Sequence, residues 1–185
     1  MAPAIRLLLA FSALGAGLIH LAVGAGAPFP LWVLLVGFGI AELGWAVATL
    51  YTGRIVLPRL TLGGSLVPVA VWAATATLGS GLGVSAQATG LPLFPMFIAS
   101  LFNIFLAVTL AVLARNAVDS TRRPLSSDKP AGWKFATALV LGGVIFSGLT
   151  TPALAATNAG LYAVPHGSHS IPALEFLESD SHAGH

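Results

Sequence analysis

Residues 30–51 read PLWVLLVGFGIAELGWAVATLY, an apolar stretch with a single acidic side chain and no basic one, Glu42 lying near its middle. As a helix it would be about 33 Å long, enough to cross the hydrocarbon core of a bilayer, about 30 Å thick. Four other stretches have the same character, and the first is too long for the apolar part of a signal peptide. The predicted spans are 4–24, 30–51, 60–82, 94–114 and 133–156.

Composition excludes a soluble globular protein. Of the 185 residues, 56% are hydrophobic and only 8% are charged, whereas soluble domains carry about 25% charged residues. The chain has no cysteine, which excludes disulfides and thiolate metal sites. The fold class predicted from these observations is an all-α integral membrane protein with a bundle of five transmembrane helices over residues 1–156, followed by a polar tail over residues 157–185.

The positions of the basic residues predict the orientation of this bundle. With five spans, every Lys and Arg falls at the start of the first span, between the second and third, or between the fourth span and the first residues of the fifth. Because cytoplasmic segments carry an excess of Lys and Arg, we expect a cytoplasmic N-terminus and an extracytoplasmic tail. The residues concerned are Arg6, Arg54, Arg59, Arg115, Arg122, Arg123, Lys129 and Lys134.

Two polar residues lie near the expected membrane midplane. Glu42 precedes Arg54 by 12 residues, and Asn103 precedes Arg115 by 12 residues, so both lie about 18 Å from the cytoplasmic end of a helix. A charged carboxylate in hydrocarbon is costly, which predicts that Glu42 is protonated, paired or hydrated. Asn103 is expected to form a hydrogen bond between helices.

His20, on the first span, is the obvious partner for Glu42. Counting residues from the outer ends of the two spans places His20 about 12 Å shallower than Glu42. We therefore expect no direct contact unless the first span extends to Ala27, although a water could bridge the two groups. The functional alternative is a proton or cation relay, and the structural alternative is a packing interaction.

The tail contains four of the five histidines, in the motifs His-Gly-Ser-His and His-Ala-Gly-His. Imidazole is a common ligand of copper and zinc, and the tail has acidic residues but no basic ones. These features predict a Cu or Zn site, whereas a solvated tail that contacts another protein is the alternative. The candidate ligands are His166, His169, His182, His185, Glu178 and Asp180.

The sequence excludes several functions and leaves two open. One histidine within the spans is too few for a di-haem bundle, and no nucleotide, flavin or nucleic-acid motif and no catalytic triad is present. We therefore expect a non-enzyme in a bacterial plasma membrane. The favoured interpretation is an accessory or assembly subunit whose tail binds copper or zinc and docks to a partner membrane complex. The alternative is a transporter or channel for a small solute, an ion or protons that uses Glu42, and either protein could form a homo-oligomer.

Overall fold

The computed structural model describes residues 3–81, 91–120 and 132–162. These residues form five α-helices, one short 3-10 turn and no strand. All five helices are long and apolar enough to cross a membrane, which confirms the predicted all-helical class and the five apolar segments. The largest difference from a predicted boundary is in the fourth helix, which was predicted to end at residue 114 and continues to Ser120. The elements are α1 (Pro3–Gly24), α2 (Leu31–Thr52), α3 (Pro58–Gly81), α4 (Leu93–Ser120), α5 (Gly132–Ala155) and η1 (Gly160–Tyr162).

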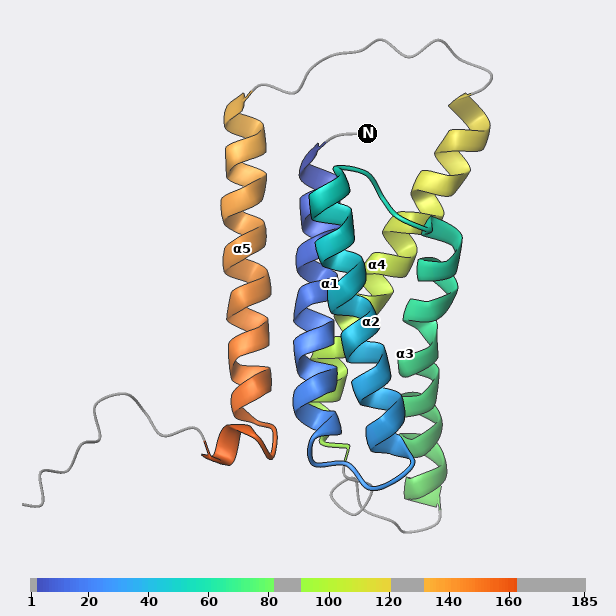
Figure 1. Ribbon diagram of the computed structural model, residues 1–185, viewed down its shortest axis with the longest axis vertical. Coiled ribbons are helices and arrows are strands. Elements are labelled where there is room, and N and C mark those ends of the chain that lie inside the picture. The colour runs from blue at the N-terminus through green and yellow to red at the C-terminus, as the bar shows by residue number, and fades with distance from the viewer. Residues whose placement is uncertain (1–2, 82–90, 121–131, 163–185) are drawn as a thin grey trace, which may run out of the picture.

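The helices alternate in direction, so the start of α1, the end of α2, the start of α3, the end of α4 and the start of α5 lie together (Figure 1). Arg6, Arg54, Arg59 and Arg115 all belong to this end, which we call the basic end. The opposite end holds the connection between α1 and α2. At the basic end, α2 stops at Gly53, whose left-handed backbone (φ 68°) suits glycine. The Arg6 guanidinium donates to the Gly53 carbonyl and thereby joins α1 to α2.

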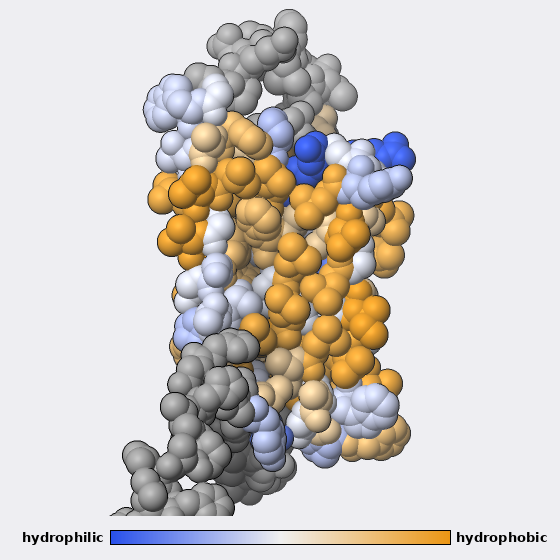
Figure 2. Space-filling view, turned by 60° about the vertical axis from the view of Figure 1, so that its left-hand side comes forward, coloured by the Kyte–Doolittle hydropathy of each residue, from blue (hydrophilic) through white to orange (hydrophobic). Residues whose placement is uncertain are grey.

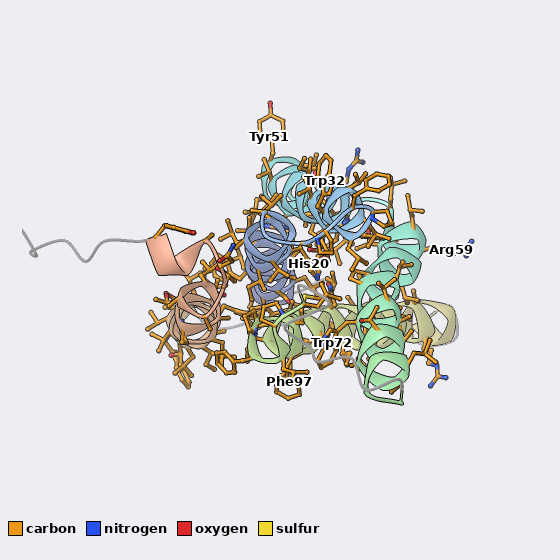
Figure 3. All side chains as sticks on the ribbon, turned by 90° about the horizontal axis from the view of Figure 1, so that it is seen from below. His20, Trp32, Tyr51, Arg59, Trp72 and Phe97 are labelled. Atoms are coloured by element: carbon orange, nitrogen blue, oxygen red, sulfur yellow. The ribbon has the colours of Figure 1, made fainter. Side chains whose placement is uncertain are left out.

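The central helix of the fold is α1. It packs against α2, α4 and α5, while α3 packs mainly against α4 and contacts α2 only sparsely. Small buried residues such as Ala10, Ala13 and Ala16 let the neighbouring helices approach α1 from several sides. Seen along the bundle, α1 to α4 are arranged around a common centre that their side chains occupy, and α5 lies outside them (Figure 3).

The crossing of α1 and α2 is especially close at Gly17 and Gly39. A Cβ atom added to Gly39 would lie 2.9 Å from the Gly17 carbonyl oxygen and 2.7 Å from the Leu21 Cγ. Side chains at this crossing would push the helices apart, so the two glycines set their separation. Gly39 belongs to the stripe that α2 buries, which consists of Leu35, Gly39, Glu42, Ala46 and Thr49.

The outer surface of the helices is apolar. Ile40, Val47 and Val144 are each more than half exposed, and Figure 2 shows hydrophobic residues over much of the middle of the visible face. Exposed aromatic residues lie near both ends of the bundle, with Tyr51 and Trp133 at the basic end and Phe29 and Tyr162 at the opposite end. Figure 3 shows Tyr51 pointing away from the bundle. An apolar belt with aromatic margins is the surface that a bilayer requires.

Candidate functional site

The most unusual polar feature of the fold is a direct contact between His20 on α1 and Glu42 on α2. The Nδ1 atom of His20 lies 2.7 Å from the Oε2 atom of Glu42, and the side chains are 1% and 9% exposed. Glu42 lies at the middle of α2, 11 residues after Leu31 and 10 before Thr52. The expectation that the two residues would not touch is therefore wrong.

The contact forms because the end of α1 and the start of α2 lie at different levels along the bundle. Gly24 lies beside Leu35 and Val36, so the first turn of α2 extends beyond the last turn of α1. Beyond the end of α1 at Gly24, backbone hydrogen bonds form turns as far as Ala27, so the contact forms without an α-helix that extends to Ala27. Helical side chains tilt toward the N-terminus of their own helix. Because the helices are antiparallel, this tilt brings His20 and Glu42 toward each other.

A cavity of about 510 Å³ adjoins the pair. It lies between α2 and α3, with Ala13 of α1 and Leu106 of α4 behind it. Within the described chain, the Oε1 atom of Glu42 is buried without a hydrogen-bond partner, and Glu42 forms part of the cavity wall. The lining residues are Ala13, Phe38, Ala41, Glu42, Gly44, Trp45, Ala48, Val56, Leu57, Leu60, Thr61, Gly64, Ser65 and Leu106.

The other polar side chains of the cavity wall direct their donors to the backbone. The Trp45 indole donates to the Val56 carbonyl at 2.6 Å, which holds the connection between α2 and α3 against the basic end of the cavity. The Thr61 hydroxyl donates to Leu57 at 3.1 Å, and the Ser65 hydroxyl donates to Leu62 at 3.1 Å. Among the lining residues, Glu42 is the one with an ionisable side chain.

Among the described residues, Asn103 does not make the hydrogen bond between helices that the sequence suggested. It is completely buried on α4, and neither amide atom has a partner among the described residues. The neighbouring Phe102 carbonyl accepts a 2.7 Å hydrogen bond from Ser12, so Asn103 lies on the basic side of the His20 level. Thr49 lies seven residues beyond Glu42 on the same buried stripe of α2, and its hydroxyl is also unpartnered there. Polar groups without partners thus extend from Glu42 toward the basic end.

The structure does not test the predicted metal site. His166, His169, His182, His185, Glu178 and Asp180 lie outside the described residues. Within 3–81, 91–120 and 132–162, no group of three or more His, Asp or Glu side chains is placed to hold a metal ion. His20 and Glu42 alone are two ligands, fewer than the three or four protein ligands usual for zinc.

Comparison with known proteins gives no independent indication of function. No family model matches the chain, and no curated protein or solved structure is significantly similar to it. Function is therefore inferred from the site alone. The sequence identified His20, Glu42 and Asn103, but it did not identify the cavity beside them. Two lining residues that the sequence did not identify are Trp45 and Gly64. Trp45 lies three residues from Glu42, and Gly64 lies on α3.

Proposed function

We propose that this chain is a small multi-pass membrane transporter in which His20 and Glu42 form a proton-exchanging site. The observation that supports the proposal is the buried 2.7 Å contact between them, in which Glu42 also forms part of a cavity wall and its buried Oε1 atom has no partner among the described residues. Ionisable residues within membrane spans are costly and commonly belong to proton or ion pathways. A pair of this kind holds a proton without leaving an isolated charge in hydrocarbon.

The position of the pair also favours transport. Glu42 lies at the middle of a helix long enough to cross a bilayer, so a group bound there is about equally far from both surfaces. Thr49 and Asn103 offer buried polar groups that have no partner among the described residues, at levels between Glu42 and the basic end. Buried polar groups of this kind commonly bind water. Water between them would connect Glu42 to the basic side.

Proton movement into liposomes tests this function. In vesicles that contain the purified protein and a trapped pH dye, a membrane potential should drive protons inward. We expect Glu42→Gln to reduce proton entry to the rate of protein-free vesicles, because a neutral amide does not provide the negative charge that would hold a proton on the pair. Asp119→Asn, the same chemical change in the last turn of α4, is the matched control and should retain entry. Equal rates in the wild type and in Glu42→Gln would refute the proposal.

The proposed orientation places the basic end in the cytoplasm of a bacterial cell. The clustering of Arg6, Arg54, Arg59 and Arg115 at one end supports it. Because the chain contains no cysteine, single cysteines can report the orientation. Ala25 is exposed directly after α1, at the end opposite the basic end, and Thr52 is exposed at the end of α2, at the basic end. On intact cells, an impermeant maleimide should label Ala25→Cys, and it should label Thr52→Cys only after permeabilisation. The reverse pattern would invert the orientation.

The tail supports a second proposal, that of a metal-binding accessory subunit. It rests on the sequence of His166-Gly-Ser-His169 and His182-Ala-Gly-His185, together with the acidic residues of the tail. Such a subunit would load or stabilise a partner membrane complex. This proposal does not require the His20–Glu42 pair, so the two can be separated by experiment.

Metal titration of the full chain and of a chain truncated after Val164 tests the second proposal. We expect near-stoichiometric binding of Cu²⁺ or Zn²⁺ to the full chain and its loss on truncation, because the imidazoles would be removed. The His20→Gln variant of the full chain is the control and should bind metal normally. Unchanged binding after truncation would exclude the tail as the metal site.

A further inference from the structure

We propose that the cavity beside Glu42 binds lipophilic amines, whose ammonium group donates to the Oε1 atom of Glu42. This inference rests on the proposed function and names the class of substrate that the same site would exchange for a proton. It depends on the size and lining of the cavity, on the unpartnered oxygen, and on the opening between α2 and α3.

The cavity has the dimensions and the lining of a site for an organic molecule. Its volume of about 510 Å³ falls in the range of roughly 300–1,000 Å³ typical of small-molecule sites. Nearly all of its lining is apolar, which favours a hydrocarbon body. Phe38 and Trp45 add aromatic rings on either side of Glu42, and aromatic faces attract organic cations.

The charge of the site favours a ligand with a cationic group. Among the described residues, no Lys or Arg lines the cavity and the Oε1 atom of Glu42 has no partner. This atom can only accept a hydrogen bond when the carboxyl is ionised. An ammonium N–H is the donor that this atom lacks. A bound carboxylate or phosphate would instead face Glu42 with like charge.

Binding of the amine is balanced by release of one proton. In the proposed cycle, the empty site holds a His20 imidazolium whose Nδ1–H donates to the Oε2 atom of the Glu42 carboxylate, 2.7 Å away. When an ammonium donates to Oε1, the N–H bond at Nε2 of His20 breaks and that proton leaves. The Nδ1–H bond to Oε2 remains, and no other covalent bond changes. The site is neutral before and after, so the exchange leaves no uncompensated charge in the membrane.

The route of entry is lateral. Helices α2 and α3 contact each other only sparsely, and the cavity lies between them. Several lining residues are also exposed on the outer surface, namely Ala41, Gly44, Leu57 and Leu60. A lipophilic amine dissolved in the bilayer would reach Glu42 through this side without crossing either polar surface.

Binding of radiolabelled dibenzylamine to the full chain in lipid nanodiscs tests the inference. We expect saturable binding that Glu42→Gln weakens roughly tenfold or more, because a charge-assisted hydrogen bond is lost. Unlabelled 1,3-diphenylpropane has the same shape, with a methylene in place of the amine, and should not compete. Equal competition by the hydrocarbon, or equal binding by Glu42→Gln, would overturn the inference.

Two adjacent glycines provide a matched control that leaves Glu42 intact. A Cβ atom added to Gly63 or to Gly64 would meet nothing within 4 Å, but only Gly64 lines the cavity. Gly64→Leu should therefore abolish amine binding, and Gly63→Leu should preserve it. Equal effects of the two variants would contradict the assigned site. If Glu42-dependent proton entry is observed and dibenzylamine does not bind, the substrate class fails while the proposed function stands.

Discussion

Replacing His20 with alanine is expected to lower the free energy of unfolding by about 3–5 kcal/mol, the usual cost of removing one partner from a buried ion pair. The change leaves the Glu42 carboxyl in an apolar interior with neither oxygen partnered among the described residues. Equilibrium unfolding in bicelles would measure the effect.

The double variant separates the interaction from the loss of packing. In His20→Ala with Glu42→Leu, no ionisable group remains at the contact, so the double variant should be more stable than the sum of the two single effects predicts. Strict additivity would show that the 2.7 Å contact contributes no coupling free energy.

A methyl group at Gly39 is expected to destabilise the fold by about 1–3 kcal/mol, as overpacking in a close-packed interior does. In Gly39→Ala the new Cβ would lie 2.9 Å from the Gly17 carbonyl oxygen, which is backbone and cannot rotate away. The helices α1 and α2 must separate, which also lengthens the contact between His20 and Glu42. The same unfolding measurement in bicelles would detect both the loss of stability and a weaker coupling of the pair.

Gly37→Ala is the control for this prediction. Gly37 lies two residues away on the same helix, and an added Cβ there would meet nothing within 4 Å. Because alanine favours helix over glycine by up to about 1 kcal/mol, this variant should be neutral or slightly more stable. Equal destabilisation by the two substitutions would mean that the close crossing at Gly39 does not limit the approach of the helices.

Much of the fold could be predicted from hydrophobicity alone. Runs such as residues 30–51 are too long and too apolar for a soluble domain, so the number and rough limits of the helices followed directly. Alternation of direction then placed Arg6, Arg54, Arg59 and Arg115 at one end, as the structure has them. The continuation of α4 to Ser120 was missed because polar residues end an apolar span without ending a helix.

The contact at the candidate site could not be predicted, because it depends on the relative level of two helices. Counting from the ends of the spans assumed that the end of α1 and the start of α2 lie at the same level. In the structure, Gly24 at the end of α1 lies beside Leu35 and Val36. Glycine and alanine are so frequent here that nothing in the sequence marked Gly17 and Gly39 as the close crossing. The cavity was equally hidden, because it reflects the sparse contact between α2 and α3.

Asn103 shows a different limit of the sequence. A buried amide in an apolar helix predicts a hydrogen bond, yet the packing of α4 against α1 supplies none to it within the described chain. A polar residue can be recognised from the sequence, but its partner depends on side-chain directions. The metal site predicted at His166, His169, His182 and His185 lies outside the described residues and stays a prediction.

The response of the Glu42 carboxyl group to pH, measured in a bilayer, tests the central claim most directly. Infrared spectra of the membrane-embedded protein, compared with those of Glu42→Gln, isolate the carboxyl band of this residue. We expect this band to change reversibly with pH in the wild type and to respond differently in His20→Gln. A Glu42 carboxyl band that does not change with pH, in both the wild type and His20→Gln, would contradict a proton-exchanging pair.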